Sequence, residues 1–480
     1  MKFTAQVLSE AEQARIHEAS LTILADIGIK FLGEKALPIL KKNGAKVDEE
    51  RKIARLPKEL VEETINSAPR SFLLGARNPI YDFQMPSTVT RYCIDGTATF
   101  AVDFHTGEKH YGTIKDIENG LRIFQQLDMG VMAWAPVCAS ETPAHSRALH
   151  EFFSLMKFSS KHGQHELHFT NQVPYLIAGL QAVRSIETNV HAHKNYSLIY
   201  CPVAPLKHDG EMLDAYIELG RLELPIQIMP MPVCGTTGPA SLFSNICQAN
   251  AEALSSIVIF QLAHPGRPLI YSNATGTMDF RNGAYLGGTP EMGLMAAALT
   301  QMGRYYHLPT SSAGCTSDAK QAGPEAVMEK LLTTIPPVCA GADIIVGLGE
   351  IESDQLMALE QLVVDNEIAH FCERLYAGVD TDSIKDLSGD IAQYAASGNY
   401  LVSKNTRLTA RSSEFYYPAL TDRHSFDAWL NLGKPTMYKN AREKVEEILA
   451  APMVDQLPES ISNELNEILN AADKELAVNK

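Results

Sequence analysis

The residues of this chain that could take part in chemistry follow short β-rich runs, at the points where each run gives way to a loop. Rings in such positions can hold a quaternary ammonium, which donates no hydrogen bond and is bound by ring faces and dispersion. Thiols and imidazoles in the same positions can ligate zinc. The candidates are Trp134, Cys138, His165, Glu166, His168, Tyr200, Cys201, Met229, Met231, Cys234, Asn273, Cys315, Asp318, Glu350 and Glu352.

Aromatic side chains at or near the run ends could form a box around a cation. They are Trp134, Tyr196, Tyr200, Tyr271 and Phe280. Ordinary core packing is the alternative for each of them taken singly, because aromatic residues are usually buried. The prediction is therefore that these rings converge on one site.

Acids near the run ends could neutralise a cationic ligand or exchange protons with it. They are Glu166, Asp279, Asp318, Glu350 and Glu352. Salt bridges and helix caps are the alternative for most of them, and Asp318 also has the residue type of a cap. Glu350 directly follows a Gly-Leu-Gly segment at the end of the last run, where a carboxylate would project into the mouth of a barrel.

A metal site is a second use for the cysteines and histidines. Cys138, Cys201, Cys234 and Cys315 end runs, but the close Cys or His-Cys pairs of zinc sites do not occur, and inert buried thiols are the alternative. Histidines at 162, 165 and 168 would point to different faces of a strand. No GxSxG nucleophile motif is present. We expect no metal of the chain's own, and a zinc-dependent barrel enzyme remains the alternative.

Eight β-rich runs alternate with amphipathic helical stretches between about residues 95 and 375. Gly, Pro, Ser or Asn occupies most of the joins. We predict strands near Thr97–Val102, Val131–Val137, His165–Phe169, Tyr196–Cys201, Ile226–Met231, Leu269–Ser272, Thr310–Ala313 and Ile344–Gly347. Helices are predicted to begin near Ile114, Ala144, Val173, Gly210, Leu242, Pro290, Pro324 and Leu356.

The predicted fold is α/β, a (β/α)8 TIM barrel with N-terminal and C-terminal helical extensions, because eight right-handed βα units close most economically into a barrel. A doubly wound open sheet is the alternative, but no GxGxxG follows any run. We expect a helical extension over residues 1–90, the catalytic barrel over 91–378 and a helical region over 379–480. The reactive centre of such a barrel lies at the carboxyl ends of its strands.

Composition narrows the classes of partner. Lys and Arg number 41 against 57 Asp and Glu, so the net charge is 41 − 57 = −16 and nucleic acid is not an expected partner. Eight scattered Cys without a CxxC indicate reduced thiols in a cytosol. No signal peptide or run of about 20 apolar residues is evident, so we expect a cytoplasmic protein that does not bind membranes.

From about Arg91 to Asn366 the sequence resembles the trimethylamine methyltransferase (MttB-like) superfamily, corrinoid-dependent methyltransferases built on a (β/α)8 barrel. Single segments are weak evidence, but their order and spacing are fairly specific. The segments that carry the resemblance are Phe104–Glu108, Thr275–Arg281, Gly288–Glu291, Gln301–Tyr306, Thr316–Lys320, Glu352–Ser353 and Gln361–Glu367.

The sequence departs from the founding members of that superfamily in three places. Those members hold a pyrrolysine near the segment that here reads Asp318–Gly323 in standard residues, so the chain resembles the non-pyrrolysine members, several of which act on betaines. Leu401–Arg407 stands where a His-rich segment is common, and Glu350 stands where an apolar residue is usual. A quaternary ammonium substrate would be consistent with the standard residues in place of pyrrolysine, because its leaving group is a neutral tertiary amine that needs no covalent activation.

The resemblance implies that the barrel binds a small quaternary amine such as glycine betaine, proline betaine, carnitine or γ-butyrobetaine. Its methyl group would pass to cob(I)alamin on a separate cognate corrinoid protein, by positioning rather than through a named catalytic residue. Arg281, His168 or Asn273 would hold the substrate carboxylate, and Glu350 would balance the ammonium charge. A homo-oligomer is expected from size, and a zinc-dependent methyltransferase or a non-catalytic betaine-binding protein are the alternatives. The expected substrate-binding residues are Trp134, Glu166, His168, Tyr200, Tyr271, Asn273, Phe280, Arg281, Asp318 and Glu350.

Overall fold

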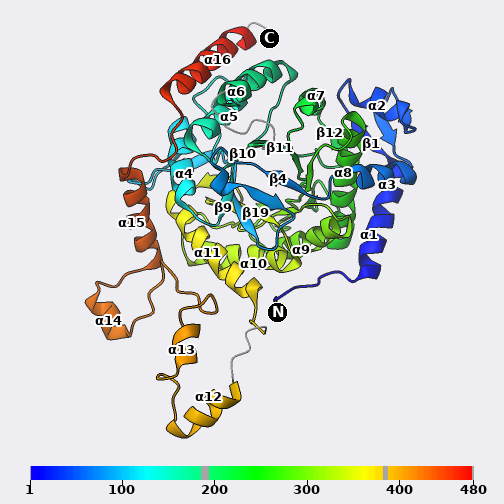
Figure 1. Ribbon diagram of the computed structural model, residues 1–480. Coiled ribbons are helices and arrows are strands. Elements are labelled where there is room, and N and C mark those ends of the chain that lie inside the picture. Colours follow the sequence, from blue (N-terminus) through cyan, green and yellow to red (C-terminus); the bar gives the residue numbers. More distant parts are fainter. Residues whose placement is uncertain (1, 185–193, 382–386, 478–480) are drawn as a thin grey trace.

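The computed structural model describes residues 2–184, 194–381 and 387–477, and at its centre is an eight-stranded parallel barrel (Figure 1). The strand order is β15-β13-β11-β10-β9-β6-β19-β18. A bridge between Tyr271 and Thr310 brings the two ends of this sheet together, and Tyr271 N–H donates to Pro309 O at 2.9 Å. The strands are β6 (Arg91–Ile94), β9 (Gly130–Ala133), β10 (His162–His165), β11 (Tyr196–Tyr200), β13 (Ile226–Ile228), β15 (Leu269–Tyr271), β18 (Ser311–Ala313) and β19 (Ile344–Leu348).

One long helix follows each barrel strand and packs on the outside of the barrel, which confirms the predicted (β/α)8 fold. The helices are α4 (Ile114–Gln126), α5 (Arg147–Phe158), α6 (Val173–Arg184), α7 (Gly210–Leu219), α8 (Leu242–Ala263), α9 (Pro290–Tyr305), α10 (Pro324–Ala340) and α11 (Leu359–Ala377). Capping residues stabilise the first turn of several of these helices. Thr113 and Asp116 form a capping box for α4, and Thr289 caps α9, whose first residue is Pro290.

Two barrel strands lie earlier in the chain than the sequence predicted. The first is β6, not Thr97–Val102, and the third is β10, not His165–Phe169. The β-branched run after Thr97 does form a strand, β7 (Phe100–Val102), but it pairs outside the barrel. Its neighbours there are β8 (Lys109–Tyr111), β20 (Glu350–Ile351) and β21 (Leu356–Met357). Asp95 therefore stands at the end of the first barrel strand.

The N-terminal region contains strands as well as the predicted helices. Helices α1 (Glu10–Thr22), α2 (Ala36–Lys42) and α3 (Lys58–Ser67) accompany a small sheet of β1 (Ile29–Phe31), β2 (Lys46–Asp48), β3 (Ile53–Arg55) and β12 (Lys207–His208). The hairpin of β4 (Phe72–Leu74) and β5 (Phe83–Met85) crosses the amino end of the barrel. There Gly75 N–H donates to Lys194 O, and the Gly75 carbonyl lies 2.7 Å from His162 Nδ1. That end is covered, so a ligand must enter at the other.

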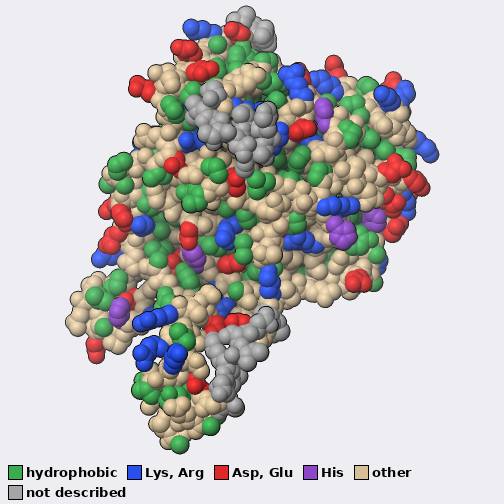
Figure 2. Space-filling view, in the orientation of Figure 1, with side chains coloured by type: hydrophobic (Ala, Val, Ile, Leu, Met, Phe, Trp, Pro, Cys, Tyr) green, Lys and Arg blue, Asp and Glu red, His purple; other side chains and the backbone are tan. Residues whose placement is uncertain are grey.

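The C-terminal region returns to the barrel only in part. Helix α15 (Met437–Ala450) packs on α4 and α11, and α16 (Glu459–Ala477) packs on α5 and α6. Three helices lie between α11 and α15 in the sequence and project from the barrel as an arm (Figure 1). They are α12 (Leu387–Tyr394), α13 (Lys404–Thr409) and α14 (Phe426–Asn431). Large apolar side chains are exposed along this arm, and Lys and Arg lie among them (Figure 2).

Helix α8 has the length and composition of a membrane span. Most of it is buried inside the protein, however, with 83% of its most apolar window out of contact with solvent. It packs against α1, α3 and α9 as one of the outer helices of the barrel. A short sheet of β14 (Val233–Cys234), β16 (Gly276–Met278) and β17 (Tyr285–Leu286) lies beyond the barrel strands that precede α8 and α9.

Candidate functional site

A cavity of about 310 Å³ opens at the carboxyl ends of the barrel strands. Each of the eight strands, or the segment directly after it, contributes to its wall. Small residues leave the space: a Cβ on Gly96 would lie 2.6 Å from the Trp134 ring, so glycine there lets the indole lie across the wall. The lining consists of Asp95, Gly96, Thr97, Trp134, Glu166, His168, Ile199, Cys201, Met212, Met229, Met231, Ala274, Ala313, Thr316, Val346 and Asp354.

A chain of polar contacts holds the indole of Trp134. Its Nε1–H lies 3.0 Å from Glu166 Oε2 and 3.1 Å from His165 Nδ1. On the far side of the imidazole, His165 Nε2 lies 3.1 Å from Glu151 Oε2, and Glu151 Oε1 accepts a hydrogen bond from Ala139 N–H. The ring of Trp134 is therefore fixed by a side chain of the cavity wall and by a buried ion pair behind it.

His165 has the environment of an imidazolium. Burial alone would lower its pKa, but the negative charges of Glu166 and Glu151 outweigh burial and raise the pKa above its ordinary value. A doubly protonated ring donates from Nδ1 to Glu166 at 3.3 Å and from Nε2 to Glu151. Trp134 then donates to Glu166, because Nδ1 carries its own proton.

Three carboxylates gather beside the cavity, two of them on its wall. Asp95, Glu350 and Asp354 place oxygen atoms within 4.8 Å of one another. Asp354 lies in the turn between β20 and β21, and Glu350 is the first residue of β20. Burial, with the charge of Asp354, raises the pKa of Asp95 well above its usual range, and burial raises the pKa of Asp354 to about 6. Burial and the two neighbouring acids raise the pKa of Glu350 in the same way.

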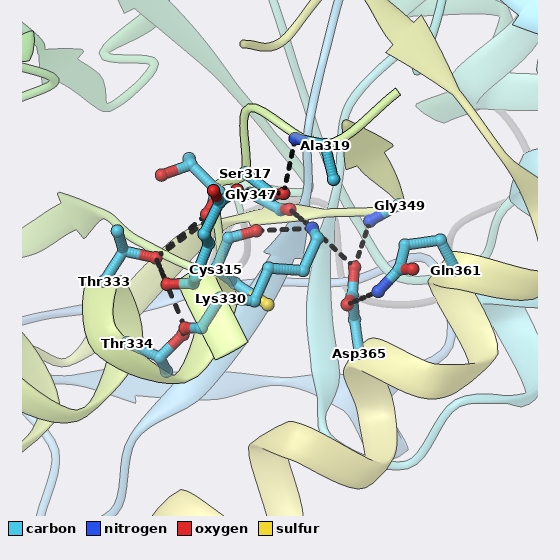
Figure 3. Close-up of polar contacts among 12 residues, drawn as sticks. Cys315, Ser317, Ala319, Lys330, Thr333, Thr334, Gly347, Gly349, Gln361 and Asp365 are labelled. Carbon is cyan, nitrogen blue, oxygen red and sulfur yellow. Dashed lines mark hydrogen bonds and ion pairs between the residues drawn. The ribbon is translucent and has the colours of Figure 1, made fainter. Parts of the chain in front are cut away.

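A buried ion pair fixes the strand end that leads to Glu350 (Figure 3). Lys330 Nζ on α10 lies 2.9 Å from Asp365 Oδ2 on α11, and both side chains are fully buried. The same ammonium donates to Cys315 O and Gly347 O at the ends of β18 and β19, at 2.5 and 3.2 Å. Asp365 accepts in turn from Gly349 N–H at 2.7 Å. The pair therefore joins two helices to the backbone of two strand ends.

Gly347 adopts a conformation that side chains disfavour. Its φ is +146°, and a Cβ would lie 1.9 Å from Gly314 O, so no other residue fits. The register of β19 against β6 shifts between Val346 and Leu348. This irregularity turns the chain so that Glu350 leaves the barrel and pairs with Met357 in the outer hairpin.

The remaining wall is apolar and sulfur-rich. Met212, Met229 and Met231 line it together with Ile199 and Val346. Met231 is 40% exposed and marks the open side. The Cys201 thiol also lines the cavity, but burial raises its pKa to about 12, so it is protonated at neutral pH. It is therefore a packing group rather than a nucleophile.

The structure brings together part of the predicted set. Trp134, Glu166 and His168 line the cavity. Glu350 lies behind the wall, beside Asp95 and Asp354. Asp318 accepts from Gly287 N–H at 2.8 Å and from Ser353 Oγ at 2.7 Å, so it holds the loop that carries Asp354.

Two predicted aromatic residues face the helices, away from the cavity. Tyr200 has its hydroxyl 2.8 Å from His208 Nδ1 and its ring edge-on to Phe260 of α8. Tyr271 donates to Asn250 Oδ1 of α8 at 2.7 Å. The predicted rings therefore do not converge as a box around the cavity. Apart from the imidazole of His168, the ring in the described lining is the indole of Trp134.

The other three predicted residues lie outside the cavity lining. Asn273 is buried and donates from Nδ2 to Ser312 Oγ at 3.2 Å. Phe280 is 68% exposed on the surface. The Arg281 side chain is 89% exposed and forms an ion pair with Asp279 at 2.7 Å. Neither of these exposed residues reaches the wall.

Asp95, Thr97, Met212 and Asp354 are wall residues that sequence reasoning missed. The signal for Asp95 was available, because an apolar run, Tyr92–Ile94, ends in Asp-Gly. Asp354 follows Glu350 by four residues in a loop, and only the hairpin of β20 and β21 returns it to the wall. Within the residues that the structure describes, the four run-end cysteines take part in no group of three or more potential metal ligands.

Comparison with known proteins identifies relatives along the whole chain. A family model described as trimethylamine methyltransferase (MTTB) matches residues 2–477. The trimethylamine methyltransferase MttB of Methanosarcina barkeri is 29% identical over 475 residues, which cover 96% of this chain and 94% of that protein. The glycine betaine methyltransferase of Desulfitobacterium hafniense strain Y51 is 28% identical over 483 residues, or 98% of each chain.

A solved structure supports the fold. The crystal structure of the hydroxylamine MtmB complex superposes with a TM-score of 0.51 at 12% identity, covering 93% of this chain and 89% of that one. At this level of identity the likeness concerns the barrel architecture alone.

The Lys330–Asp365 pair gives a first testable prediction. Replacing Lys330 by Met leaves Asp365 as a buried charge without its partner, which should lower the free energy of unfolding by about 3–5 kcal/mol. The double variant Lys330→Met/Asp365→Leu removes both charges and should regain most of that loss. Urea denaturation followed by circular dichroism measures both; a single variant as stable as the parent would contradict the role of the pair.

The protonation of His165 gives a second prediction. A folded-state pKa above the ordinary 6.5 means that the imidazolium stabilises the fold fully below that pH, and that this stabilisation is lost as pH rises through the folded pKa. Protonated imidazole quenches indole emission. With the second tryptophan removed by Trp429→Phe, Trp134 emission should rise at a midpoint above pH 6.5. The rise should be absent when His165→Gln is added, and a midpoint below 6.5 would show a neutral ring.

Proposed function

Because the chain belongs to the trimethylamine methyltransferase family, we propose that it removes an N-methyl group from a small quaternary amine, glycine betaine or a related betaine. The acceptor is cob(I)alamin on a separate corrinoid protein. The observation that carries this proposal is a cavity in which one fixed indole, buried carboxylates and methionine side chains surround a space for a small cation.

Trp134 supplies the ring face that a trimethylammonium needs. A cation over an indole is attracted by the ring quadrupole, and the attraction grows when water is excluded. Its Nε1–H is anchored to Glu166, so the ring is held in place before the ligand arrives. Met212, Met229 and Met231 give polarisable contacts for the methyl groups.

The charge of the wall also favours a cation. Asp95, Glu166 and Asp354 line the cavity, while Lys and Arg are missing from its described lining. The lining imidazole of His168 can donate to a substrate carboxylate. The proposed substrate site is therefore Trp134, Glu166 and His168, with Asp95, Asp354 and Glu350 beside it as acids that a nearby cation would ionise.

The chain's part in the reaction is to bind, orient and exclude water. The leaving group is a neutral tertiary amine, so no proton has to be delivered to it, and positioning supplies the rate enhancement. Cob(I)alamin supplies the nucleophile when the partner is bound. The cavity is far too small to enclose a corrin ring, so the partner has to present it at the open side, near Met231.

Two further features belong to the proposal. The segment 318–323 reads in standard residues, which fits the non-pyrrolysine interpretation, since a quaternary substrate needs no covalent adduct. A cytoplasmic location fits the reduced state of the eight cysteines, all of which are free thiols.

Methyl transfer itself provides the third prediction. The protein, mixed with cob(I)alamin and a panel of betaines, should form methylcobalamin, followed by absorbance. Trp134→Leu should raise KM by about 30-fold, corresponding to about 2 kcal/mol of lost cation–π attraction. Trp134→Phe should keep part of the affinity, and Trp429→Phe should leave KM unchanged.

The outcomes separate the proposal from its alternatives. Tight binding of a betaine in calorimetry without any methyl loss would make the chain a non-catalytic binding protein. One tightly held zinc per chain, needed for activity, would favour the zinc-dependent methyltransferase. Failure of every quaternary amine to yield methylcobalamin would overturn the function.

The projecting arm indicates self-association, and we propose that a second copy of the chain covers it. Between residues 389 and 436 only Ser403 and Leu420 are buried, so the arm cannot hold its shape through a core of its own. Leu401 is 82% exposed and Phe426 70% exposed. Many large apolar side chains exposed on one segment are typical of an interaction surface.

The arm gives a fourth prediction, on oligomeric state. The parent chain should elute as a dimer or larger oligomer in size-exclusion chromatography with light scattering. Leu401→Glu should shift it toward the monomer, because it places a charge in the covered surface. Ile80→Glu, at a position that is 78% exposed outside the arm, should leave the mass unchanged. A parent chain that is monomeric at all concentrations would contradict the proposal.

A further inference from the structure

The three carboxylates beside the cavity form more than a source of negative charge. We propose that Asp95, Glu350 and Asp354 hold one divalent metal cation of the hard, oxygen-binding class, at the wall of the substrate cavity. This departs from the sequence-based expectation of a chain without a metal of its own.

Glu350 is the independent observation that points to a ligand. Its side chain is fully buried, and neither carboxylate oxygen has a hydrogen-bond partner in the described part of the chain. A hydrogen-bond contribution from Ala98 N–H lowers the pKa of Glu350, but the hydrogen bond whose geometry this N–H satisfies goes to Pro136 O at 3.2 Å. A buried carboxylate without a partner is costly, so this carboxylate needs either a proton or a cation.

The other two acids leave oxygen atoms free on the same side. Asp95 accepts one hydrogen bond at Oδ1, from Gly96 N–H at 3.0 Å. Asp354 Oδ1 is buried and has no hydrogen-bond partner among the described residues. Lys330 cannot neutralise the cluster by direct contact, because its three donors go to Asp365, Cys315 O and Gly347 O.

The spacing fits a single small ion. Oxygen ligands lie about 2.0–2.6 Å from Mg²⁺ or Ca²⁺, so two ligands of one ion are at most about 5 Å apart. The three oxygen positions lie within 4.8 Å of one another. A methylated nitrogen does not fit among them, since a methyl carbon approaches an oxygen no closer than about 3.3 Å. The substrate ammonium and this cation therefore occupy different places.

The donor set selects the class of metal. Three carboxylates without a thiolate or imidazole favour Mg²⁺, Ca²⁺ or Mn²⁺ over Zn²⁺. Asp95 and Asp354 face the cavity, so the ion can be reached from it and can keep coordination positions directed into it.

One consequence rests on the proposed function. The described lining of the cavity has no Lys or Arg to receive the carboxylate of a betaine. A divalent cation at the wall would supply that contact, while Trp134 and Glu166 hold the ammonium. With Glu166 and three cluster acids ionised, one divalent ion leaves the site net negative, so a cation is still attracted.

Metal binding tests the site without an activity assay. The full chain, freed of metal by EDTA and dialysis, should bind one Mn²⁺ in calorimetry and release protons as it does so. Glu350→Gln should weaken Mn²⁺ binding by at least about tenfold. The matched control is Glu352→Gln, two residues along, because the Glu352 carboxylate pairs with Lys109 at 2.5 Å outside the cluster.

Mn²⁺ binding by the two variants decides whether the three carboxylates form the metal site. Binding that is lost in Glu350→Gln and kept in Glu352→Gln supports the site. No binding of Mn²⁺, Mg²⁺ or Ca²⁺ at millimolar concentration, or equal binding by both variants, overturns it. Glu350→Gln removes a buried charge, so its melting temperature without metal should equal or exceed that of the parent; a lower value would indicate a misfolded variant, and Asp354→Asn would then replace it.

The role in substrate binding is measured separately. Glycine betaine should bind more tightly to the Mn²⁺ form than to the metal-free form, whereas tetramethylammonium, which has no carboxylate, should not. If glycine betaine binds equally to both forms, the carboxylate contact is wrong although the metal site stands. If neither amine binds to either form, the proposed function fails and the Mn²⁺ calorimetry still decides the site.

Discussion

The buried ion pair between Lys330 and Asp365 determines where the carboxyl ends of β18 and β19 stop. An ammonium and a carboxylate without solvent must satisfy every donor and acceptor locally, and here they do so with the backbone of both strand ends. An apolar pair could fill the same volume, but it would not bind the carbonyls of Cys315 and Gly347. The pair therefore fixes the start of the loop that carries Glu350 and Asp354, and with it the part of the cavity wall that follows β18 and β19.

The cavity itself follows from the distribution of side-chain size between the two faces of the strands. The large rings of Tyr200 and Tyr271 pack outward against α8, where Phe260 and Asn250 receive them. Several positions that line the cavity at the strand ends are small, such as Gly96, Ala274 and Ala313. A barrel with large inward residues at this level would be a packed core, so the same alternation that stabilises the helix layer leaves room for a ligand.

This distribution also explains which parts of the site the sequence could predict. The eight βα units were readable because apolar runs and helical stretches alternate with turn residues at each join. The face of each strand was not readable: buried parallel strands are apolar on both faces, so Ile199 and Tyr200 give no period-two signal that tells inside from outside. Trp134 and Glu166 follow their strands and were found. Asp95 was missed because Thr97–Val102, which has three β-branched residues, was predicted as the first barrel strand, whereas Phe100–Val102 forms an outer strand.

Under the proposed function, the polar residues of the site act through charge rather than through proton transfer. A displacement that releases a neutral amine needs no general acid, and the thiol on the wall is protonated. That function would require a cation-selective space that excludes water, and carboxylates in such a space repel one another when ionised. Asp95, Glu350 and Asp354 therefore cost stability unless protons or a cation neutralise them. A positive ligand that neutralises the three acids would recover this cost, so the proposed cation site gives their clustering a physical reason.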